Sequence, residues 1–146
     1  MTIDEVFDSI SGDEWLNAIE PYQMMTLKEM GFDGSNSELI AERWLKASTA
    51  NTVPFGTEVN SNLFLVNLKK EVIKLICDET AYIDIKEQIN KLPGGSPAVI
   101  VSIISAAIAP VVGTSSPLIT PIVSLLLYSF GKITKNAFCR TYYVKE

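Results

Sequence analysis

Short apolar clusters separated by helix-breaking positions run through the first 50 residues. Thr2 can cap a first helix, and Ser11 or Asp13 can cap a second one. Because proline suits the first turn of a helix, Pro21 marks the start of a third. The apolar period then predicts helices over residues 2–10, about 13–20, 21–30 and 37–50.

The middle of the chain holds the clearest amphipathic pattern. Between Leu63 and Cys77, apolar residues recur every three or four positions with charged residues between them, which predicts a helix with one apolar face. A shorter amphipathic segment predicts another helix from about Thr80 to Leu92. The segment 51–62 contains proline, glycine and small polar residues, and it is the only long linker candidate.

An uncharged stretch between Lys91 and Lys132 is the most unusual feature of the sequence. Ser96-Pro97 and Ser116-Pro117 are both strong helix starts, and an almost continuous apolar run follows each of them. We therefore predict a helical hairpin over residues 96–139, in which the second helix continues to the end of that range. The fold class is all-α, a compact bundle of about six or seven helices around this hairpin.

The charges divide the chain where the linker lies. Met1 to Asn60 contains 11 acidic and 3 basic residues, whereas Ser61 to Glu146 contains 6 acidic and 9 basic ones. An acidic half repels phosphate backbones, so we expect no nucleic-acid partner. The predicted parts are an acidic N-terminal helical subdomain, a linker and a C-terminal helical bundle, at residues 1–50, 51–62 and 63–146.

Catalytic and metal-binding chemistry has little support in the composition. The chain has no histidine, which removes the commonest general base and metal ligand. No glycine-rich loop has the Gly-Lys-Ser/Thr ending of a phosphate-binding loop. Acid–base catalysis by two carboxylates needs burial that separates their pKa values, and nothing in the sequence suggests such burial for any carboxylate pair. We therefore expect no enzyme activity, no catalytic residue, no cofactor and no metal site.

The two cysteines and the N-terminus bear on location. Cys77 and Cys139 each end an apolar run, and we interpret both as free, small, buried hydrophobic residues. The first residues contain neither a basic stretch nor an early apolar run, so no signal peptide is expected. These features predict a cytoplasmic protein, and its compactness and cysteine use favour a bacterial source.

Three interpretations of the hairpin remain open: a buried core, an interface, or a membrane-inserting element. Ser96 to Val112 spans 17 residues, about 25 Å of helix, and Pro117 to Phe130 only 14, whereas a bilayer core is about 30 Å thick. These lengths favour burial. In hydropathy alone, however, the hairpin resembles the hydrophobic hairpins of pore-forming toxins, which insert into membranes after release from a soluble fold.

The sequence thus predicts a non-enzymatic helical interaction or assembly protein, a small accessory component of a bacterial multi-protein system. Its partner is expected to be another protein or a second copy of itself. The alternative is a membrane-active protein whose hairpin enters a bilayer. The candidate contact residues lie on the hairpin and the C-terminal tail: Val101, Ile104, Ile108, Val123, Leu126, Leu127, Tyr142 and Tyr143.

Overall fold

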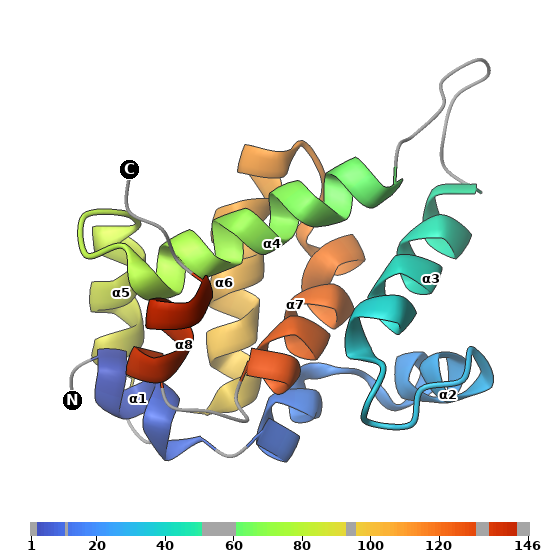
Figure 1. The fold of residues 1–146 in the computed structure, drawn as a ribbon, viewed down its shortest axis with the longest axis horizontal. Helices are drawn as coiled ribbons and strands as arrows, with labels where there is room; N and C mark the ends of the chain where they lie inside the picture. Colours follow the sequence, from blue (N-terminus) through green and yellow to red (C-terminus); the bar gives the residue numbers. More distant parts are fainter. Residues whose placement is uncertain (1–2, 11, 51–60, 93–95, 131–134, 143–146) are drawn as a thin grey trace.

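The computed structural model describes residues 3–10, 12–50, 61–92, 96–130 and 135–142 (Figure 1). Within these ranges all regular elements are helices, so the predicted all-α class is confirmed there. The elements are α1 (Ile3–Ser9), the 3₁₀-helix η1 (Gly12–Ala18), α2 (Pro21–Glu29), α3 (Ser37–Ala50), α4 (Ser61–Cys77), α5 (Ile83–Asn90), α6 (Pro97–Val112), α7 (Ser116–Phe130) and α8 (Lys135–Tyr142).

Helices α6 and α7 are covered by most of the other elements. α7 packs against α3, α6 and η1, while α4 and α5 pack against α6 (Figure 1). Apolar residues from both halves of the chain share one core. Much of α7 is buried in that core, as expected for a helix without charge: Ile119, Pro121, Ile122, Val123, Ser124, Leu125, Leu126 and Leu127.

Two long-range hydrogen bonds fix α3 and the preceding loop to α7. The indole N–H of Trp44 donates to the carbonyl of Leu118 at 3.2 Å, and the hydroxyl of Tyr128 donates to the carbonyl of Gly34 at 3.0 Å. Gly34 has a φ of +90°, and a Cβ at this position would lie 3.0 Å from the Tyr128 hydroxyl oxygen. Glycine therefore serves both the backbone conformation and the close approach of the tyrosine.

The chain does not continue as one helix from α7 to Cys139. The ring centroids of Phe130 and Phe138 lie 4.4 Å apart, whereas eight residues of a continuous helix would separate them by about 12 Å along the axis. The predicted single helix is therefore wrong. α7 ends at Phe130, and α8 lies back against α4 and α1 (Figure 1).

Three other features of the fold differ in detail from the prediction. The second helix is of the 3₁₀ type, as is common for short helical connections. α5 is shorter than predicted, because Tyr82 adopts a left-handed conformation with a φ of 55° just before it. α6 and α7 bend by 116° at their break, so they cross rather than run antiparallel. Most of the predicted linker, residues 51–60, lies outside the described residues; Ser61 and Asn62 belong to α4.

Candidate functional site

The structure places six of the eight predicted contact residues in the core. They lie on the faces of α6 and α7 that pack against neighbouring helices, and each is at most 2% exposed: Val101, Ile104, Ile108, Val123, Leu126 and Leu127. The expectation that these side chains form a contact surface is therefore corrected, since large apolar residues stabilise the fold most when water is excluded from them. Tyr142 ends α8, and its side chain, like all of Tyr143, lies outside the described part of the chain.

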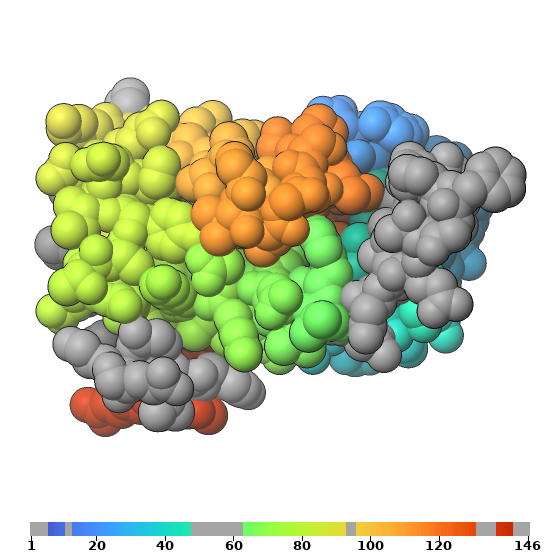
Figure 2. Space-filling view, turned by 90° about the horizontal axis from the view of Figure 1, so that it is seen from above, coloured from blue at the N-terminus to red at the C-terminus, as the bar shows by residue number. Residues whose placement is uncertain are grey.

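Another face of α6 reaches the surface. Val99, Ser102, Ala106 and Pro110 are exposed and follow each other at spacings of three and four residues, so they form one row along the helix. None of them is charged, and all except Val99 have compact side chains. We call this row the α6 strip. Near its C-terminal end, the segment around the turn into α7 (orange) reaches the surface beside α4 (green) in Figure 2.

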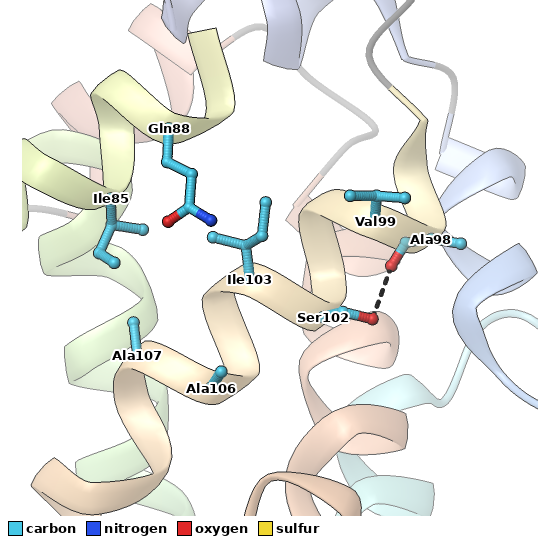
Figure 3. Close-up of a pocket in the computed structure, with 8 residues that line it drawn as sticks. All are labelled: Ile85, Gln88, Ala98, Val99, Ser102, Ile103, Ala106 and Ala107. Carbon is cyan, nitrogen blue, oxygen red and sulfur yellow. Dashed lines mark hydrogen bonds between the residues drawn. The ribbon is translucent and has the colours of Figure 1, made fainter. Parts of the chain in front are cut away.

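An open groove of about 500 Å³ lies between the α6 strip and α5 (Figure 3). We call it the α5–α6 groove. α5 contributes two side chains, Ile85 and Gln88, which point toward α6 (Figure 3). α6 contributes the other lining residues: Ala98, Val99, Ser102, Ile103, Ala106 and Ala107.

The lining of the α5–α6 groove is almost entirely apolar. The hydroxyl of Ser102 donates to the carbonyl of Ala98 at 3.0 Å, within its own helix. Gln88 is the other polar lining residue, and its carboxamide can both donate and accept. Since no lining residue is ionisable, the groove suits apolar side chains with one hydrogen-bonding group, rather than acid–base chemistry.

A second hollow, of about 550 Å³, is polar and lies at the turn from α4 to α5. There the Tyr82 hydroxyl donates to a carboxylate oxygen of Glu71 at 2.7 Å. Burial, followed by the hydrogen bond and charge of Glu71, raises the pKa of Tyr82 above its ordinary value. Asp78 accepts hydrogen bonds from the backbone N–H and hydroxyl of Thr80, and Lys86 donates to the Asp78 carbonyl. These groups bond to one another and build the turn.

Carboxylates elsewhere also serve local structure. Asp33, in the loop before α3, accepts hydrogen bonds from the hydroxyl of Ser35 at 2.7 Å and from its backbone N–H at 2.9 Å. These bonds lower the pKa of Asp33, because they favour its charged form.

In the part of the chain that the structure describes, no three histidine, cysteine, aspartate or glutamate side chains gather in a way that could hold a metal ion.

The cysteines are not free. Cys77, at the end of α4, forms a disulfide with Cys139 of α8, and their Cα atoms lie 5.5 Å apart across 62 residues of sequence. The prediction of two free buried thiols is therefore wrong. The physical reason is the return of α8 onto α4, which brings together two cysteines that hydrophobic periodicity treats as unrelated.

Among the described helices, no single one is both long enough and apolar enough to cross a bilayer. Within the described part of the chain, α6 and α7 meet the required length and composition only when taken together, as a pair bent by 116°.

Comparison of this chain with protein-family models, curated proteins and solved structures finds no match. The candidate site therefore rests on the geometry of the α5–α6 groove. The predicted contact residues include three on α6, Val101, Ile104 and Ile108, but none of the exposed residues of that helix. The available signal was the three- and four-residue spacing of compact side chains at Ser102, Ala106 and Pro110.

Proposed function

We propose that this protein is a non-enzymatic assembly protein that pairs with a second copy of itself through the α5–α6 groove. In this proposal the other helices form a compact bundle around α6 and α7. The observation that supports pairing most directly is the α6 strip, a solvent-exposed helix face without any charge. An apolar surface beside an open groove is typical of a protein contact site.

Charge favours a second copy as the occupant. The chain has a net charge of −5, so two copies repel each other on average. Two copies of the α6 strip can meet without bringing any like charges together. A two-fold pairing places the same patch of each copy in contact, which an uncharged strip satisfies with itself.

Side-chain size favours close packing of α6 on α6. Ser102 and Ala106 lie in the middle of the α6 strip, and their small side chains permit helix axes to approach to about 8 Å. Val99 and Ile103 then provide the larger apolar side chains beside them, and the α5–α6 groove provides the space to receive their counterparts from the other copy. In this geometry Gln88 lies at the edge and can exchange hydrogen bonds.

The test is the molar mass in solution of an Ala106→Glu variant. Ala106 is exposed, so the substitution leaves the core intact, but it brings two carboxylates together at a paired α6 strip. We expect the wild type to have twice the mass of the 16.1 kDa chain by light scattering, and the variant to be monomeric.

Ala47→Glu is the matched control, because Ala47 is also an exposed helical alanine, on α3. This control should keep the wild-type mass. A wild type that is monomeric at all concentrations would contradict self-association. Loss of pairing in both variants, or in neither, would contradict the proposed location.

A second candidate function is insertion of α6 and α7 into a bilayer, and the observation that favours it is the length and composition of this bent pair. The test is co-sedimentation with vesicles of phosphatidylcholine and phosphatidylglycerol. Self-association through the groove predicts that the protein stays in the supernatant. Recovery in the pellet, together with leakage of a trapped dye, would favour the membrane function instead.

A further inference from the structure

Among the side chains of helix α8 that the structure describes, few face the rest of the protein. It has eight residues, a length at which an isolated helix is unstable in water. Its exposed positions include Ala137, Arg140 and Thr141, and the Thr141 hydroxyl donates to a carbonyl within its own helix. The position of α8 against α4 and α1 therefore depends on the residues that face inward.

Among the described side chains of α8, the two that face inward are consecutive, Phe138 and Cys139. Phe138 is 2% exposed, and its ring packs on that of Phe130 at the end of α7. Cys139 forms the disulfide with Cys77. One attachment is thus apolar and the other covalent, and only the covalent one responds to redox conditions.

We propose that the Cys77–Cys139 disulfide is a redox-responsive latch that holds α8 against α4, and that its reduction by a dithiol releases α8. Both cysteines are partly exposed, so a reductant can approach them from the surface. Once the bond is broken, Phe138 is the buried side chain left, among those of α8 that the structure describes, to offset the conformational entropy that an eight-residue helix gains on release. Release uncovers the apolar surface between Phe138 and Phe130.

The reaction is ordinary thiol–disulfide exchange. A thiolate of the dithiol attacks one sulfur atom, the bond between Cys77 and Cys139 breaks, and the displaced cysteine thiolate takes up a proton. The second thiol of the reductant then attacks the mixed disulfide, frees the other cysteine and closes the reductant's own disulfide. Two electrons and two protons pass from the dithiol to the protein. A reducing cytosol would keep the latch open, and an oxidising compartment would close it.

The latch differs from a purely structural disulfide in what reduction changes. A structural bond affects the stability of the whole fold, whereas a latch changes the opening of one element. Native-state hydrogen exchange separates the two cases, because it measures the opening of each helix individually. The inference is independent of pairing through the α5–α6 groove, since α8 does not line that groove.

The experiment follows amide exchange by mass spectrometry in the full chain, before and after addition of dithiothreitol. We expect exchange in α8 to accelerate by roughly tenfold or more on reduction, while exchange in α6 and α7 stays unchanged. A double variant, Cys77→Ser with Cys139→Ser, should show the fast α8 exchange without reductant and should not respond to it. Adding reductant to the folded wild type keeps the test valid if this variant folds poorly.

Three results would overturn the latch. Two alkylatable thiols in protein purified under oxidising conditions would show that the bond does not form. Unchanged exchange in α8 after reduction would show that α8 stays attached without the disulfide. Equal acceleration in α6, α7 and α8 would show that the disulfide stabilises the fold as a whole.

Discussion

Tyr82 illustrates at the residue scale how one side chain can hold a strained backbone. Its φ of 55° and ψ of 38° are in the left-handed region, which costs a residue with a Cβ about 1 kcal/mol or more. The hydroxyl of Tyr82 bonds to Glu71 on α4, and this bond fixes the start of α5 against the preceding helix. The strain is thus offset by an interaction between two elements.

Ionisation of the Tyr82 hydroxyl should require an unusually high pH. Burial and the carboxylate of Glu71 raise its pKa, so the folded protein holds this proton more tightly than the unfolded chain. The resulting stabilisation is complete below the ordinary tyrosine pKa of about 10 and is lost as the pH rises through the higher folded value. In a spectrophotometric titration of the folded protein, Tyr82→Phe should remove the tyrosinate transition that lies above the ordinary tyrosine pKa. Glu71→Gln should lower its midpoint, and an unchanged curve in both variants would contradict the assignment.

Two serines in the core differ from Tyr82, because their buried hydroxyl groups lack the hydrogen bond that would offset the loss of water. Ser105 and Ser124 are fully buried, and neither hydroxyl oxygen has a hydrogen-bond partner among the described residues. The hydroxyl of Thr120, in the same helix as Ser124, bonds to the carbonyl of Ser116 at 2.7 Å. An unsatisfied buried hydroxyl costs about 1–3 kcal/mol.

Removal of such a hydroxyl should therefore not harm the protein. We expect Ser124→Ala to raise the free energy of unfolding by about 1 kcal/mol, measured by urea denaturation. Ser9→Ala, at an exposed serine whose hydroxyl bonds to the Val6 carbonyl, is the control and should change it by less than about 0.5 kcal/mol. A clear loss of stability in Ser124→Ala would mean that this hydroxyl has a partner.

At the scale of elements, the accuracy of prediction followed the contrast between polar and apolar positions. α3 begins at Ser37 and ends at Ala50 as predicted, because polar residues mark its outer face and its ends. α8 was mispredicted because Ala137 and Phe138 keep the apolar period of α7, and periodicity does not reveal a reversal between two helices. The pairing of Cys77 with Cys139 could not be predicted from periodicity either, because it depends on the same reversal.

The burial of α7 makes it the element on which stability should depend most. Leu126 is fully buried, so Leu126→Ala leaves a cavity and should lower the free energy of unfolding by about 3 kcal/mol. Val66→Ala on α4 removes a side chain that is 48% exposed and should cost less than about 0.5 kcal/mol. Equal losses in urea denaturation would show that α7 is not the centre of the core.

At the scale of the whole molecule, the sequence draws attention to α6 but does not identify the face of α6 that reaches the surface. α6 is apolar on all sides, so no polar row identifies the side that water reaches. Selecting the largest side chains, such as Ile104 and Ile108, selected the core instead. The packing of α4, α5, α7 and η1 around α6 shows that Ser102 and Ala106 face outward. The candidate site is a consequence of tertiary packing.

The most direct test of self-association through α6 is an intermolecular NOE measurement on a mixture of methyl-labelled and unlabelled chains. Self-association through α6 predicts contacts between copies at the methyl groups of Val99, Ile103 and Ala106, without similar contacts at the distant exposed residues Met25 and Leu63. Absence of NOEs between copies at the three α6 residues, or their presence only at residues outside the α5–α6 groove, would contradict it.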